Sequence, residues 1–163
     1  MEGSRGSRIA WIIDLADGGI AFGKVMGEIM RVAPGAAVAV PIAQLNTGRL
    51  TFDGVARSAD GQLWIGTDGG GLIVLDPVSG KVREIRHDPS KAPGLPDGRV
   101  WSVMVDRSGL LWVGTTVGIG VTDPGADAVL SLLPGQDRSR GLKHASVGAI
   151  PVSYTHLRAH ETR

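Results

Sequence analysis

Short runs of apolar residues alternate with glycine-rich turns along most of the chain. Runs of this length, bounded by turn residues, predict β-strands rather than helices. The clearest stretch predicts four strands, at residues 52–58, 62–67, 71–76 and 81–86. The turns between them hold residues that favour chain reversal, namely Asp60-Gly61, Asp68-Gly69-Gly70, and Asp76-Pro77 with Gly80. The pattern therefore predicts an antiparallel meander of four strands.

The same pattern returns 48 residues later. LWIGTDGGGL at 63–72 is echoed by LWVGTTVGIG at 111–120, and Asp76-Pro77 returns as Asp123-Pro124 after a one-residue deletion. Strand-rich repeats of roughly 40–50 residues are typical of propeller blades. We therefore expect an all-β fold, a partial β-propeller of four-stranded antiparallel blades. The repeated positions are Gly61, Leu63, Trp64, Gly66, Thr67, Gly70, Asp76 and Pro77, followed by Gly109, Leu111, Trp112, Gly114 and Thr115.

The repeated strands are apolar on both faces. Leu111 and Val113 point to one side of their strand, and Trp112 to the other. A sheet with one solvated face would alternate apolar with polar residues, so this pattern predicts a neighbour on each side. We expect Trp64 and Trp112 to pack between blades, and Gly66 and Gly114 to lie where the adjacent blade comes close.

The repeats divide the chain into predicted units. Residues 1–49 are a degenerate first blade and connector, in which Trp11 and Asp17-Gly18-Gly19 are aligned with Trp64 and Asp68-Gly69-Gly70. There we expect the fourth strand at 27–32 and an enlarged connector at 34–48. The later units are complete blades at 50–97 and 98–144 and the start of another blade at 145–150.

The last residues differ in character from the rest. Residues 151–163, PVSYTHLRAHETR, hold the chain's only tyrosine and two of its four histidines, and they resemble the translation of a transposase-type sequencing adapter. We expect this tail to be non-native and the natural sequence to be interrupted in mid-blade. His156 and His160 are therefore given no functional role.

Composition narrows the functional classes. The formal net charge of +1, with mixed signs, argues against nucleic acid and anionic membranes as partners. The absence of cysteine excludes disulfides and thiol chemistry. No apolar run reaches the roughly 20 residues of a membrane-spanning helix.

No motif predicts a catalytic, metal or cofactor site. The glycines of GTDGGG precede the strand LIVLDP, whereas a phosphate loop needs a helix after its glycines. His87 and Asp88 lie in a proline-rich connector, where loop capping is favoured over acid–base chemistry. Trp101, near the inner or upper edge of a blade, is the one candidate for ligand contact.

The two better units resemble the two-component regulator propeller repeat. The resemblance rests on DGQLWIGTDGGGLIVLDPVSGKVREIRHDP and RVWSVMVDRSGLLWVGT, and covers roughly residues 50–125. It implies a noncatalytic, periplasmic or extracytoplasmic sensor that binds a small molecule or glycan. It also implies further blades and a downstream histidine kinase or diguanylate cyclase. The alternatives are a streptogramin-lyase-like propeller enzyme and a generic propeller scaffold.

Overall fold

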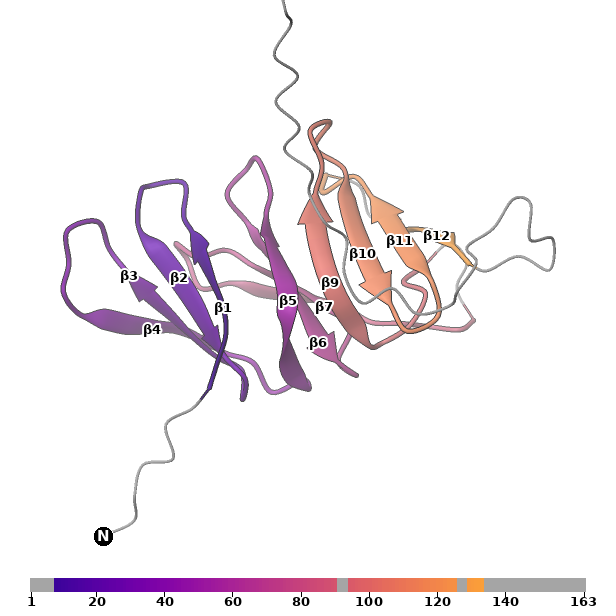
Figure 1. Ribbon diagram of the computed structural model, residues 1–163, viewed down its shortest axis with the longest axis horizontal. Coiled ribbons are helices and arrows are strands. Elements are labelled where there is room, and N and C mark those ends of the chain that lie inside the picture. Colours follow the sequence, from indigo (N-terminus) through magenta and orange to yellow (C-terminus); the bar gives the residue numbers. More distant parts are fainter. Residues whose placement is uncertain (1–7, 91–93, 126–128, 134–163) are drawn as a thin grey trace, which may run out of the picture.

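The computed structural model describes residues 8–90, 94–125 and 129–133, which form three four-stranded antiparallel sheets in chain order, the second and third linked by a single parallel bridge (Figure 1). The expected all-β fold with four-stranded antiparallel blades is confirmed. Sheet 1 contains β1 (Ile9–Asp14), β2 (Ile20–Lys24), β3 (Glu28–Val32) and β4 (Ala39–Gln44). Sheet 2 contains β5 (Arg49–Arg57), β6 (Leu63–Asp68), β7 (Leu72–Leu75) and β8 (Val82–Ile85). Sheet 3 contains β9 (Val100–Val105), β10 (Leu111–Thr115), β11 (Ile119–Thr122) and β12 (Leu130–Leu132).

The first strands of the three sheets adjoin one another. β1 contacts β5, and β5 pairs with β9 in parallel at Asp53 and Ser102. We call this side of the molecule, formed by β1, β5 and β9, the inner edge. Each meander turns at two rims. The hairpin rim carries the turns after the first and third strands, and the connector rim carries the turns after the second strands and the links between sheets.

Apolar side chains fill both spaces between the sheets. Trp64 is fully buried against Val100 and Val113 of sheet 3, and its indole N–H donates a 3.1 Å hydrogen bond to the Ser58 hydroxyl. Sheets 1 and 2 enclose a second cluster that includes Trp11 and Ile65. Because both faces of sheet 2 are buried, its strands need apolar residues at successive positions, as in LWIGT.

Gly66 allows sheets 2 and 3 to approach closely. A Cβ at this position would lie 2.6 Å from Cγ1 of Val100, which is closer than real side chains come. The close neighbour is thus a valine side chain of the adjacent sheet. Gly23 has the same place in sheet 1, where a Cβ would lie 2.5 Å from the Trp11 ring of its own sheet and 2.7 Å from Cδ1 of Leu50 of sheet 2.

The predicted alignment of the first unit is wrong. Trp11 lies on β1, so it is not the counterpart of Trp64 on β6. Asp17 and Gly18 form the turn between β1 and β2, which corresponds to the Asp60-Gly61 turn of sheet 2. Short glycine turns look alike in sequence, and pairing with the flanking strands decides which turn each one is.

The predicted enlarged connector at 34–48 contains β4, and residues 28–32 form the third strand rather than the fourth. Pro41 and alanines hide this strand in the sequence. β4 is the edge strand of sheet 1, where a proline without an N–H is tolerated. The described residues end at 133, so the predicted blade start at 145–150 and the tail at 151–163 lie outside them.

Candidate functional site

A pocket of about 340 Å³ opens where the inner edge meets the connector rim. All three sheets contribute to it: Arg8 precedes β1, Arg49 and Phe52 lie on β5, and Trp101 lies on β9. We call this pocket the inner-edge pocket. It holds Trp101, the ligand candidate named from the sequence, and adds Arg8, Arg49 and Phe52, which the sequence did not single out.

Two partly exposed aromatic side chains lie on adjoining strands of this pocket. Phe52 and Trp101 each precede one member of the Asp53–Ser102 pair that joins β5 to β9. Phe52 is 53% exposed and Trp101 is 38% exposed. The Trp101 indole N–H donates a 3.1 Å hydrogen bond to the Thr116 hydroxyl, which fixes one end of the ring. Such surfaces suit stacking against a flat ligand.

A bulge in β5 brings Phe52 into the pocket. Leu50 pairs with Thr67 and Val55 with Ile65, whereas their counterparts Val100 and Val103 in sheet 3 have two fewer residues between them. β-Bulges re-aim side chains and are common next to binding sites. The two additional residues, visible when TFDGV is set beside WSV, were the signal in the sequence that could have indicated this site.

The bulge is held by specific contacts. The Thr51 hydroxyl is buried and donates a 3.2 Å hydrogen bond to the Gly66 carbonyl. A Cβ at Gly54 would lie 2.0 Å from Oγ1 of Thr51, so a side chain there would displace this hydroxyl from its bond to Gly66. The bulge that carries Phe52 is therefore held in place by contacts within the sheet.

The charged residues that line the inner-edge pocket are two arginines, Arg8 and Arg49, and one carboxylate, Asp68. The Arg8 guanidinium lies 5.3 Å from the centre of the Phe52 ring. Among the described residues, neither Arg8 nor Arg49 is paired with a carboxylate, whereas Asp68 lies 3.8 Å from Arg99. A cation held against an aromatic face and a second unpaired guanidinium favour an anionic ligand.

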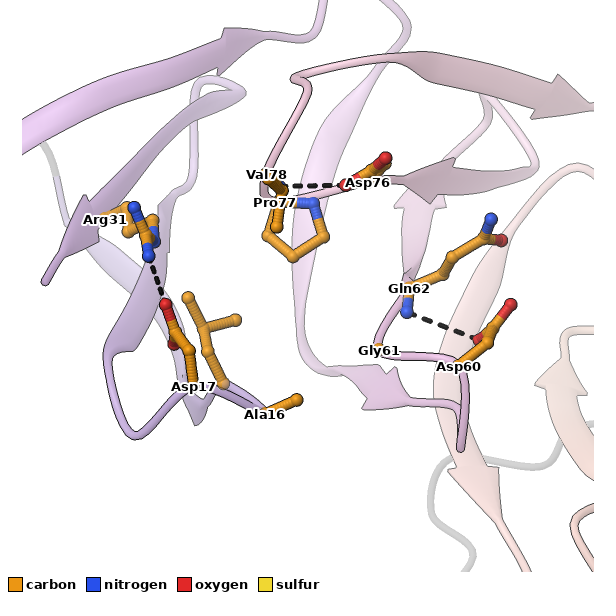
Figure 2. Close-up of a pocket in the computed structure, with 10 residues that line it drawn as sticks. Ala16, Asp17, Arg31, Asp60, Gly61, Gln62, Asp76, Pro77 and Val78 are labelled. Carbon is orange, nitrogen blue, oxygen red and sulfur yellow. Dashed lines mark hydrogen bonds and ion pairs between the residues drawn. The ribbon is translucent and has the colours of Figure 1, made fainter. Parts of the chain in front are cut away.

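A second pocket, of about 320 Å³, lies on the hairpin rim between sheets 1 and 2 (Figure 2). Asp17 and Arg31 line one side, and Asp60, Gln62 and Asp76 line the other. A pocket of about 340 Å³ recurs at the equivalent place between sheets 2 and 3, lined by Asp60, Ser108 and Asp123 among others. The recurrence shows that these pockets arise wherever hairpin turns of two adjacent sheets meet.

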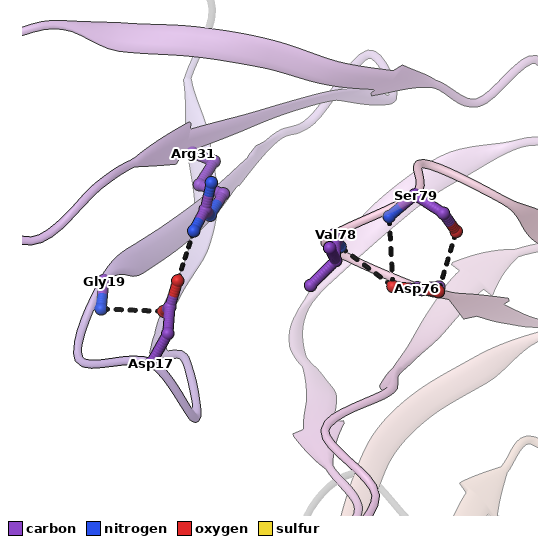
Figure 3. Close-up of polar contacts among 6 residues, drawn as sticks. All are labelled: Asp17, Gly19, Arg31, Asp76, Val78 and Ser79. Atoms are coloured by element: carbon purple, nitrogen blue, oxygen red, sulfur yellow. Dashed lines mark hydrogen bonds and ion pairs between the residues drawn. The ribbon is translucent and has the colours of Figure 1, made fainter.

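The carboxylates of this rim stabilise their own turns (Figure 3). Asp17 accepts a hydrogen bond from the Gly19 N–H at 3.0 Å and pairs with Arg31; the Gly19 contact and then Arg31 hold the pKa of Asp17 below its usual value. The Ser79 hydroxyl, 2.7 Å from Asp76, and the N–H groups of Val78 and Ser79 lower the pKa of Asp76. Because these groups are occupied in turns, the inner-edge pocket is the better functional candidate.

The other candidates named from the sequence have structural contacts. His87 Nδ1 lies 2.6 Å from the Leu95 carbonyl, and Asp88 accepts hydrogen bonds from the N–H and hydroxyl of Ser90, as expected for loop capping. Gly61 and Gly109 have positive φ in equivalent turns, and Pro77 is buried. Trp112 is half-buried on the face of sheet 3 that points away from sheet 2. Within the described ranges, no three His, Asp or Glu side chains lie close enough together to hold a metal ion.

The fold is shared with several solved structures. The extracellular domain of a putative hybrid two component system from B. thetaiotaomicron matches with a TM-score of 0.64 and 19% identity, over 86% of this chain and 18% of that one. Virginiamycin B lyase from Staphylococcus aureus matches with a TM-score of 0.63 and 16% identity, over 84% and 45%. A gluconolactonase from Xanthomonas campestris matches with a TM-score of 0.55 and 22% identity, over 81% and 50%.

These similarities show the fold alone, because all three identities are low and the chain spans half or less of each matched structure. A comparison with curated proteins gave no match. Within the described part of the chain, no helix could span a membrane. Residues 94–116, which cover β9 and β10, match the family described as two component regulator propeller. The chain is therefore a run of β-propeller blades in which residues 94–116 match the two-component regulator propeller repeat.

Proposed function

We propose that this chain is part of an extracytoplasmic, noncatalytic propeller that senses a ligand and passes the signal to a kinase or cyclase module. The observation that carries the proposal is the two-component regulator propeller match at residues 94–116. The likeness in fold to extracellular domains of two-component systems supports the same assignment. The ligand, a small molecule or glycan, binds at the inner-edge pocket, where three sheets meet.

The pocket's position suits a sensor. Its side chains come from the first strands of successive blades, so a ligand that contacts all of them favours one packing of the blades over others. A ligand shifts a conformational equilibrium only through such a difference in affinity. The shift would then be passed to the downstream module through the remaining blades.

The second candidate function is a lyase, because virginiamycin B lyase shares the fold and one matched structure is a catalytically inactive histidine-to-alanine variant of that enzyme with quinupristin. In the described part of this chain the only histidine is His87, whose Nδ1 is engaged with the Leu95 carbonyl. The full chain should therefore leave quinupristin intact. Conversion of quinupristin that is lost in His87→Ala would support the enzyme instead.

The decisive experiment is to sequence the genomic locus across residues 151–163. A coding sequence that continues through further blades to a membrane helix and a kinase or cyclase module supports the sensor. A reading frame that ends once the propeller closes, with no output module, contradicts it.

A further inference from the structure

We propose that the inner-edge pocket binds a carboxylate carried on a ring, with Arg49 and Arg8 contacting the carboxylate and Phe52 and Trp101 contacting the ring. The inference rests on the ligand-sensing function proposed above and specifies the chemistry of the ligand. Its occupant is either an aromatic acid or a sugar acid, since both combine a flat or ring-shaped apolar face with one carboxylate.

The argument begins with the arginines. Four other arginines of the described residues form ion pairs with carboxylates of the three sheets and their turns, namely Arg31, Arg57, Arg86 and Arg99. Arg49 has no such partner, although its strand neighbour across the ladder is Asp68. The Arg99 side chain comes within 3.8 Å of that Asp68 carboxylate. The guanidinium of Arg49 is therefore left available to a ligand anion.

Arg8 adds a second positive group from another sheet. It lies over Phe52, on β5, although 44 positions separate the two in sequence. The aromatic ring holds the cation at the pocket without neutralising it. Two guanidiniums on neighbouring strands can contact one carboxylate with charge-assisted hydrogen bonds, which are stronger than those between neutral groups.

The aromatic pair sets the shape of the ligand. Phe52 is placed by the two-residue bulge of β5, and Trp101 is anchored through its N–H to Thr116. The bond to Thr116 satisfies the polar edge of the indole, so the exposed part of Trp101 offers chiefly apolar surface. A ring with an attached carboxylate matches this combination of apolar surface and positive charge.

The test uses the full chain and four probes: sodium benzoate, sodium glucuronate, and their neutral counterparts benzamide and methyl glucoside. Binding is measured by titration calorimetry and by tryptophan fluorescence. We expect at least one acid to bind and its neutral counterpart to bind about tenfold more weakly, the usual scale for losing a hydrogen bond to a charged group. Binding of benzoate identifies the ligand class as aromatic acids, and binding of glucuronate identifies it as sugar acids.

Matched variants assign the contacts. Arg49→Gln should weaken binding of the acid about tenfold or more. Arg107→Gln, which removes an exposed charge from the hairpin rim, should leave binding unchanged. Trp101→Phe should retain most of the affinity that Trp101→Ala loses, and circular dichroism checks that each variant is folded.

Three results would overturn the proposal: neither acid binds, the neutral probes bind as tightly as the acids, or Arg49→Gln binds like the parent. If a neutral ligand binds and Trp101→Ala abolishes that binding, the carboxylate proposal fails and the sensor function stands. If the acids bind but the genomic locus encodes no output module, the sensor function fails and the carboxylate site stands.

Discussion

One N–H donor ties each sheet to its own first turn. In sheets 2 and 3 the donor is a tryptophan indole, and the acceptor is the first residue of the turn. In sheet 1 alanine stands at the tryptophan position and an arginine on the next strand reaches the turn instead. Donor and acceptor are Trp64 and Ser58 in sheet 2, Trp112 and Asp106 in sheet 3, and Arg31 and Asp17 in sheet 1.

Ser58→Ala should destabilise the chain by about 1–3 kcal/mol, because it leaves the buried Trp64 N–H without an acceptor. The double variant Ser58→Asp, Asp60→Ser should recover most of the loss, since it reproduces the Asp106 and Ser108 arrangement of sheet 3. Urea unfolding measures both. Equal stability of Ser58→Ala and the parent would contradict this role for the hydroxyl.

Asp106 should make the packing of sheet 3 dependent on acid pH. The Ser108 hydroxyl, then the Trp112 indole, lower the pKa of Asp106 from 3.8 to about 2. The ionised form is favoured in the folded state, so its stabilising effect is complete above pH 3.8 and is lost as the pH falls through about 2. Trp112 fluorescence should change across this window in the parent. In Asp106→Asn the change should be absent, and its persistence would assign the transition to another group.

Packing of sheet 2 against sheet 3 depends on the absence of a side chain at Gly66. Gly66→Ala should destabilise the chain by about 1–3 kcal/mol, because the new Cβ would lie 2.6 Å from Val100 Cγ1. Val100→Ala in the same chain removes that contact. The double variant should therefore lose less stability than the sum of the two single variants, as measured by urea unfolding. Strict additivity would show that the two residues do not meet.

Strand patterns were predictable in sheets 2 and 3, where turn glycines and apolar runs are regular. They misled in sheet 1, because Ala21 stands on β2 where Trp64 stands on β6, and Trp11 on β1 offered a false match. The β4 strand escaped notice since its small residues and Pro41 carry a weak strand signal. Local propensity could identify neither the alignment of sheet 1 nor the strand β4. Pairing with neighbouring strands decided both.

The outward face of sheet 3 presents a continuous apolar row. Met104, Trp112, Val121 and Leu130 lie opposite one another in register across its four strands. In sheet 2 the corresponding row contains Trp64 and Val74, and sheet 3 buries it. An apolar face of this kind favours a further sheet packed against it.

Without such a cover, the chain should self-associate or lose its fixed packing. Sedimentation velocity should show association that rises with concentration. Val121→Lys with Leu130→Lys should shift the chain toward monomer, whereas Val78→Lys, at an already exposed turn residue, should not. A monodisperse parent monomer with a sharp, cooperative unfolding transition would contradict this expectation.

The sequence alone determined the repeat, the four-stranded units of sheets 2 and 3, and the places of most turns, because these depend on residues close together in the chain. The three-dimensional packing decided the register of sheet 1 and the face that each tryptophan covers. It also decided the inner-edge pocket, which unites Arg8, Phe52 and Trp101 from three sheets. Such sites depend on contacts between distant segments, and no local pattern of residues encodes which segments will meet.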